Sequence, residues 1–121
     1  SFMVQIDAPE TIPPLPTEIE TAAYYIALEA LSNVEKHAAA KSFHLRLVLI
    51  KGNSALNPPI LEMEISDDGI GLPANRVDGL GLLSMQGRAV ELGGTCQIEP
   101  APTGGTHIRV RLPCHPELKR I

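Results

Sequence analysis

The sequence predicts an α+β protein, a two-layer sandwich in which helices cover one face of a mostly antiparallel sheet. Three observations support this fold class. A stretch free of glycine and proline, from Thr17 to Ala40, has apolar residues at helical spacing. Two segments with alternating apolar residues follow it, and a second helix and two further strands follow a glycine-rich loop. The order helix, hairpin, loop, helix, hairpin is typical of helices packed on one side of an antiparallel sheet.

The chain has 121 residues, which is the size of one domain, and we expect residues 1–121 to form a single domain with its core at 17–113. Its formal net charge of −4 argues against binding to nucleic acid or to anionic membranes. No apolar run approaches 18 residues, so neither a transmembrane helix nor a signal peptide is expected. Cys96 and Cys114 fit neither a disulfide framework nor a zinc cluster.

The first helix is predicted from Thr17 to about Ala39. Thr17 follows Pro16 and is a candidate N-cap, while Glu18 and Glu20 place negative charge in the first turn, where the helix dipole favours it. Prolines at positions 9, 13, 14 and 16 predict an irregular segment before the helix.

A β-hairpin is predicted next. Its first strand runs from Lys41 to Lys51, where apolar residues at every second position indicate one buried face. Turn-forming residues occupy positions 51–54 and 57–59. The second strand is predicted from Ile60 to Ser66.

The second half of the chain predicts a loop, a helix and another pair of strands. The loop covers Asp68–Gly81 and is rich in glycine. The helix is predicted over Leu82–Leu92, with two glycines at 93 and 94 as its stop. The last two strands are predicted over Thr95–Glu99 and Thr106–Leu112.

Polar residues occupy the apolar stripe of the first helix. At 100° per residue, Glu29, Asn33 and His37 fall in the same stripe as Ile26, and Lys36 lies at its edge. Three polar side chains on a buried face are unfavourable unless they have partners. They indicate either a binding site or a partly exposed helix end with ordinary polar contacts.

Two strands carry a polar residue on their apolar face. Asp67 follows the inward-facing residues of its strand at period two and precedes Gly69 and Gly71, so it is predicted to point inward. The alternative is a turn residue that bonds its own backbone. Thr106 shares the apolar face of the last strand, where a lone threonine is usually a satisfied core hydroxyl.

The segment Gly79–Leu82 opens the second helix with two glycines. Glycines let backbone N–H groups approach an anion, and the start of a helix attracts it. Neither the Rossmann nor the P-loop fingerprint is present. Together with an inward aspartate and an asparagine, this segment suits adenine, phosphates and Mg²⁺, which takes few protein ligands in nucleotide sites.

Four motifs in order then resemble those of sensor histidine kinases. Residues Glu29–Ala38 resemble their asparagine box, and Asp67–Gly71 resemble their first glycine box. The second glycine box is resembled by Gly79–Leu82 with the following Ser84 and Met85, and the terminal Gly-Thr motif by Gly104–Thr106. The form of the first motif and the short loop are most similar to the nitrate-sensor-type subfamily. The fold implied is the mixed-sheet Bergerat ATP-binding sandwich that gyrase, heat-shock chaperone and mismatch-repair ATPases share.

The resemblance implies a role for each matching residue. Asp67 is expected to accept a hydrogen bond from the amino group of adenine, in a pocket that Gly69 and Gly71 help to form. Thr106 is expected to support the adenine end. Asn33 is expected to bind Mg²⁺. Glu29 is the catalytic candidate. The glutamate of this motif activates water in the hydrolases of the superfamily, and in kinases it orients magnesium-bound water or the acceptor histidine. Phosphate contacts are expected from Lys36, His37, Gly79, Gly81 and the Leu82 amide.

Two departures from the family pattern stand out. Asp68 occupies the position where asparagine is common, and this change is expected to be tolerated. None of the four histidines lies in a helical hairpin that could dimerise and accept phosphate. The chain therefore resembles a cytoplasmic catalytic domain cut from a longer kinase, with or without a membrane anchor in the parent. Its expected partners are ATP, a separate dimerisation and phosphoacceptor domain and, indirectly, a response regulator.

Three functions are compatible with these residues. The first is the ATP-binding domain of a two-component kinase that phosphorylates a histidine on another domain. The second is a small serine kinase of the anti-sigma type, which has the same fold at a similar size. The third is a module that binds ATP without transferring phosphate, although Glu29 and Asn33 argue against it.

Overall fold

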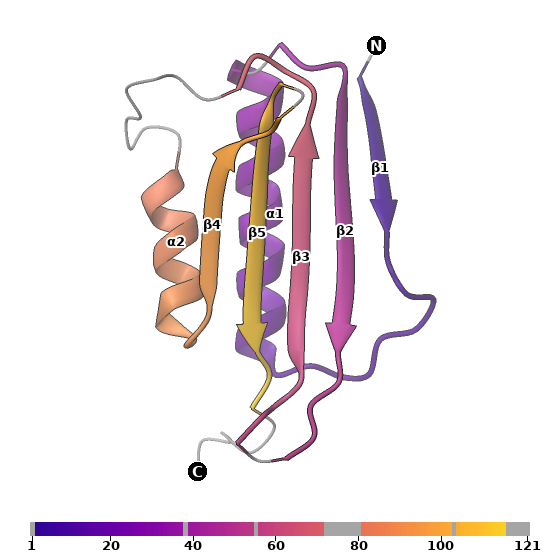
Figure 1. Ribbon diagram of the computed structural model, residues 1–121, viewed down its shortest axis with the longest axis vertical. Helices are drawn as coiled ribbons and strands as arrows, with labels where there is room; N and C mark the ends of the chain where they lie inside the picture. Colours follow the sequence, from indigo (N-terminus) through magenta and orange to yellow (C-terminus); the bar gives the residue numbers. More distant parts are fainter. Residues whose placement is uncertain (1, 38, 55, 72–80, 103, 116–121) are drawn as a thin grey trace.

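The fold is an α+β sandwich of five strands and two helices in a computed structural model that describes residues 2–37, 39–54, 56–71, 81–102 and 104–115. Both helices lie on one side of the sheet, as predicted (Figure 1). In chain order the elements are β1 Met3–Asp7, α1 Thr17–His37, β2 Ser42–Ile50, β3 Ile60–Asp67, α2 Leu82–Glu91, β4 Thr95–Pro100 and β5 Thr106–Pro113.

The sheet has the strand order β1-β2-β3-β5-β4. All neighbouring pairs are antiparallel except β1 and β2, which are parallel, so the sheet is mixed. Strand β1 is missing from the order of elements that the sequence predicts. Its five residues are all exposed, and it pairs with a strand about 40 residues later in the chain. Such a short segment has too little periodicity to be recognised without its partner.

Helix α1 begins directly after Pro16, whose carbonyl oxygen accepts hydrogen bonds from the amides of Ile19 and Glu20 at 3.0 and 3.1 Å. It ends at His37, two residues before the predicted end, and Ala39 has a left-handed φ of 50°, which a helix cannot contain. Its buried residues recur every three or four positions and are Ile19, Ala22, Ile26, Ala30 and Val34.

Helix α2 begins at the predicted residue and ends at Glu91, one residue early. Its buried residues are Leu82, Met85 and Ala89. The predicted glycine stop is confirmed, because Gly93 has a φ of 81° and the Gly94 amide bonds the Ala89 carbonyl at 2.8 Å.

The core lies between the helices and the inner face of the sheet. Cys96 and Cys114 belong to it as buried free thiols, and burial raises the pKa of Cys96 to about 11. No helix among the described residues is long and apolar enough to cross a membrane. The other core residues of the sheet are Phe43, Leu61, Met63, Ile65, Ile98, Ile108, Val110 and Leu112.

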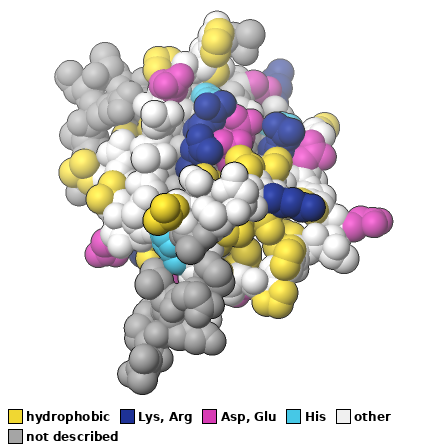
Figure 2. Space-filling view, turned by 60° about the horizontal axis from the view of Figure 1, so that its bottom comes forward, with side chains coloured by type: hydrophobic (Ala, Val, Ile, Leu, Met, Phe, Trp, Pro, Cys, Tyr) yellow, Lys and Arg dark blue, Asp and Glu magenta, His cyan; other side chains and the backbone are white. Residues whose placement is uncertain are grey.

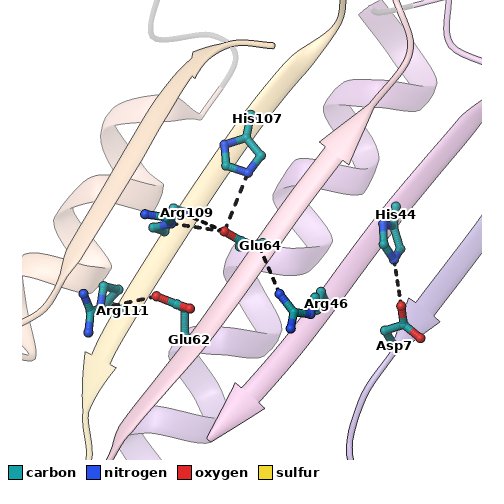
Figure 3. Close-up of polar contacts among 8 residues, drawn as sticks. All are labelled: Asp7, His44, Arg46, Glu62, Glu64, His107, Arg109 and Arg111. Carbon is teal, nitrogen blue, oxygen red and sulfur yellow. Dashed lines mark hydrogen bonds and ion pairs between the residues drawn. The ribbon is translucent and has the colours of Figure 1, made fainter. Parts of the chain in front are cut away.

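The opposite face of the sheet carries paired charges. Glu64 on β3 lies between Arg109, whose Nη2 is 2.8 Å from its Oε2, and Arg46, whose Nη1 is 3.6 Å from its Oε1 (Figure 3). Arg111 and Glu62 form a neighbouring pair at 3.5 Å. The space-filling view shows basic and acidic side chains next to one another (Figure 2). The polar side chains alternate with core residues along the same strands.

We expect Glu64→Gln to lower the free energy of unfolding by about 0.5–1 kcal/mol at neutral pH. The bond from Arg109 is the main cause that lowers the pKa of Glu64. A lowered folded pKa stabilises the protein above the unfolded pKa, and this stabilisation disappears as the pH falls through the folded value. Denaturant unfolding at neutral and strongly acidic pH measures this stabilisation, and Glu91→Gln, at an exposed position of α2, is the control. An equal loss at both pH values would contradict the prediction.

Candidate functional site

The predicted site residues gather at one end of the molecule. The end of α1, the end of β3, and the starts of β2 and β5 lie at the top of Figure 1, and α2 begins below them in the upper half of the picture. Of the predicted residues, Gly79 lies outside the described part of the chain. His37 is the last residue of α1, and the structure describes its backbone but not its side chain.

Helix α1 contributes Glu29 and Asn33, which are half-buried, and Lys36, which is exposed. The sequence places Glu29 and Asn33 within the apolar stripe. In the fold Ala30 and Val34 occupy that stripe, and Glu29 and Asn33 lie along its border. A border position lets these polar groups reach a ligand without being fully desolvated.

The carboxylate of Glu29 lies directly against Gly81, the N-cap of α2. A Cβ atom built on Gly81 would overlap the Glu29 side chain, and Gly81 has a left-handed φ of 73°. The backbone conformation at this position therefore favours glycine, and a larger residue would also require the Glu29 side chain to shift. This contact brings α1 to the start of α2, where Leu82 is buried. A helix start attracts negative charge, so the carboxylate is favourably placed.

Asp67 ends β3 and is half-buried. Its Oδ1 accepts a hydrogen bond from the Gly69 amide at 2.8 Å. This is the local turn bond that the sequence left as the alternative to a binding role. The two are compatible, because a carboxylate has a second oxygen that can accept from an amino group.

Gly105 packs against Asp67 so closely that a Cβ atom there would overlap the Asp67 carbonyl oxygen and lie 2.9 Å from Oδ1. A Cβ on Gly71 would in turn be 3.3 Å from the Gly105 carbonyl oxygen. Both glycines have φ values near 85°, at +84° for Gly105 and +85° for Gly71. Thr106 follows and is only 7% exposed. Two loops distant in sequence thus meet around Asp67.

Asp68 has a structural contact that the sequence did not predict. Its Oδ1 accepts hydrogen bonds from the amides of Lys41 and Ser42 at 2.9 and 3.0 Å. The bond from Ser42 is the main cause that lowers the pKa of this exposed carboxyl group. Asp68 therefore ties the loop after β3 to the start of β2, just beyond the end of α1. A side chain that bonds residues 26 and 27 positions away has no local sequence signal.

We expect Asp68→Ala to lower the melting temperature slightly, and Asp68→Asn to lower it less, because an amide oxygen can accept the same two bonds. Since the folded pKa of Asp68 is lowered, the difference between wild type and Asp68→Ala is present at neutral pH and is lost as the pH falls through that pKa. Thermal unfolding of the three proteins at neutral and acidic pH measures this. Identical melting of wild type and Asp68→Ala at neutral pH would contradict it.

The donor set is suited to a magnesium ion that is held mainly by its nucleotide. The described residues contain no group of three or more His, Cys, Asp or Glu side chains placed to hold a metal. Glu29 supplies carboxylate oxygen atoms at the start of α2, and Asn33 lies one turn further along α1. Mg²⁺ in nucleotide sites usually takes one or two protein oxygens, with phosphates and waters as its other ligands.

Comparison with known proteins gives a consistent result. A family described as histidine kinase-, DNA gyrase B-, and HSP90-like ATPase matches residues 18–116. The chain is 34% identical over 103 residues to sensor histidine kinase LiaS of Bacillus subtilis (strain 168), covering 84% of this chain. It is 31% identical over 113 residues to the nitrate/nitrite sensor protein NarX of Escherichia coli (strain K12), covering 90% of this chain.

Solved structures agree with these relatives. The ATP binding domain of PrrB from Mycobacterium tuberculosis has a TM-score of 0.60 and 26% identity, and the match covers 92% of this chain and 80% of that one. The blue-light activated histidine kinase of Erythrobacter litoralis EL346 has a TM-score of 0.76 at 22% identity, which shows a shared fold; the match covers 96% of this chain and 36% of that one. The chain spans only 27% of LiaS and 17% of NarX.

Proposed function

Because this chain belongs to the family of histidine kinase-, DNA gyrase B-, and HSP90-like ATPases, we propose that it binds ATP with Mg²⁺ and donates the γ-phosphoryl group to a histidine on a separate dimerisation domain in two-component signalling. We further propose that residues 1–121 form one catalytic domain of a longer kinase. The short span that the chain covers of LiaS and NarX supports this.

The adenine end of the proposed site is the junction around Asp67. Asp67 accepts from the adenine amino group, and Gly69, Gly71 and Thr106 line the same junction. The support is the close approach of Gly105 to Asp67, which holds the carboxylate between two loops at the end of the sheet. A partly desolvated carboxylate makes a strong, directional hydrogen bond to an amino group.

The phosphate end is the contact between α1 and α2. Gly81 and the Leu82 amide offer a helix start to an anion, the exposed Lys36 adds positive charge from the end of α1, and His37 is proposed as a further phosphate contact. The single observation that carries the proposal is the contact of the Glu29 carboxylate with Gly81. A triphosphate at this helix start meets a carboxylate, so a cation is needed between them.

When bound, Mg²⁺ would be held by Asn33 and would neutralise charge on the phosphates. Glu29 would orient the water or the acceptor beside it.

The phosphoryl acceptor is proposed to lie outside this chain. The two helices described here both pack against the sheet, and neither is available to form a dimerising hairpin. LiaS and NarX are named as a sensor histidine kinase and a sensor protein, which supports a histidine acceptor.

Asn33→Ala is expected to weaken binding of a non-hydrolysable ATP analogue by about tenfold in Mg²⁺, because it removes an oxygen ligand. In EDTA the loss should be much smaller. Calorimetric titration under both conditions tests the proposal, and Ser32→Ala, a similar truncation one residue earlier on α1, is the control. An equal loss in Mg²⁺ and in EDTA would assign Asn33 a structural role instead, and no binding by wild type would overturn the proposed function.

A further inference from the structure

The two edges of the sheet differ. Strand β4 at one edge is flanked by α2, whereas β1 at the other edge has no neighbour beyond it in the described part of the chain (Figure 1). All five residues of β1 are exposed, including Met3 at 65%, Val4 at 46% and Ile6 at 64%. The strand contains neither lysine nor proline, the residues that commonly protect an edge from pairing.

The free hydrogen-bonding groups of this edge belong to Val4 and Ile6. The Met3 amide donates to the Lys41 carbonyl oxygen at 2.9 Å, so Met3 directs its backbone groups toward β2. Successive residues of a strand direct these groups to opposite edges, so Gln5 and Asp7 also face β2. Val4 and Ile6 therefore present their N–H and C=O groups outward.

The side chains of Val4 and Ile6 share one face of the sheet. In the register of β1 and β2, Val4 pairs with buried Phe43, and Ile6 pairs with Leu45, which packs against the core. Both lie on the face that the helices cover, and both remain exposed there. On the other face Asp7 is held by His44, whose Nε2 is 3.2 Å from Oδ2 (Figure 3).

We propose that β1 is a self-association surface, on which the β1 strands of two copies of this chain pair antiparallel about a two-fold axis at Gln5. In this register Val4 of each copy lies opposite Ile6 of the other, with both pairs on the apolar face. The outward backbone groups of Val4 and Ile6 then bond one another across the axis, and Asp7 lies opposite Met3. The strand is thus complementary to itself, and its single charge meets no like charge. The two sheets become one continuous sheet.

The contact is expected to be weak. A five-residue strand pair buries less surface than stable dimers do, which places it among transient interfaces. Sedimentation equilibrium of the 121-residue chain should show reversible dimerisation between about 10 µM and about 1 mM. This is the concentration range in which such small interfaces associate. The measurement needs no nucleotide, so it is independent of the proposed function.

Ile6→Lys should raise the dimer dissociation constant by at least about tenfold, because each dimer loses two apolar cross-strand pairs. Val90→Lys is the matched control, since Val90 is 66% exposed, against 64% for Ile6, and lies on α2 by the opposite edge. It should leave the constant unchanged. A wild type that remains monomeric throughout, or an equal effect of the two variants, would overturn the proposal.

Amide hydrogen exchange locates the contact by residue. Between dilute and concentrated samples, exchange should slow at the Val4 and Ile6 amides and change little at Gln5, whose amide already faces β2. A dimer in which the Val4 and Ile6 amides keep their dilute exchange rates would place the interface elsewhere and overturn the proposal.

Discussion

The Asp67→Asn variant is expected to bind an ATP analogue about 10 to 100 times more weakly than wild type. The proposed bond from the adenine amino group to the Asp67 carboxylate is charge-assisted, and its loss costs about 1.5–3 kcal/mol. An asparagine oxygen can still accept the 2.8 Å bond from the Gly69 amide, so the local turn should persist. The amide nitrogen would then face the adenine amino group, donor against donor. Preference for ATP over GTP should fall for the same reason.

Calorimetric titration of both nucleotides measures the effect, and Asp68→Asn is the matched control. It makes the same chemical change at the next residue, whose Oδ1 bonds the Lys41 and Ser42 amides. The control should bind nucleotide almost as wild type does. Unchanged affinity in Asp67→Asn, or an equal loss in both variants, would remove Asp67 from the adenine site.

Incubated alone with radiolabelled ATP, the chain is expected to bind nucleotide yet incorporate almost no phosphate. Phosphoryl transfer depends on positioning an acceptor in line with the γ-phosphate, and a site without one is nearly silent. Adding the dimerisation helices of the parent kinase in trans should increase labelling by orders of magnitude, because proximity supplies much of the rate. The product should be labile in acid and stable in base, as phosphohistidine is.

The control is the same mixture with Asp67→Asn, which should transfer little because it binds little ATP. Stoichiometric labelling of the chain alone would refute an external acceptor. An acid-stable label on the added partner would favour a serine kinase. Binding without transfer to any partner would favour an ATP-sensing module.

The elements that follow from local patterning were predicted closely. Both helices and the four antiparallel strands lie within two residues of their predicted bounds, because their apolar residues repeat at 3.6 or at two residues. Strand β1 was missed because its residues are exposed and its structure depends on β2, a strand about 40 residues away.

The sequence predicts which residues make up the candidate site, whereas only the structure gives the contacts between them. The polar residues Glu29, Asn33 and Asp67 interrupt apolar patterns, and that interruption is visible in the sequence. Gly105 is visible in the sequence only as part of the Gly104–Thr106 motif, and its missing side chain is what admits the Asp67 carbonyl oxygen. Asp68 was expected only to be tolerated, and it bonds two amides at the start of β2.

The sequence by itself determined the two helices, four of the five strands and the faces that these elements bury, since these depend on the residue period along a few turns or pleats. It also determined the family, through motifs read in order. Only the tertiary structure decided that Glu29 contacts Gly81, that Gly105 approaches Asp67, and that β1 forms a bare parallel edge. Each of these joins segments far apart in the chain, and such contacts follow from how the sheet and helices pack together rather than from the local preference of any one segment.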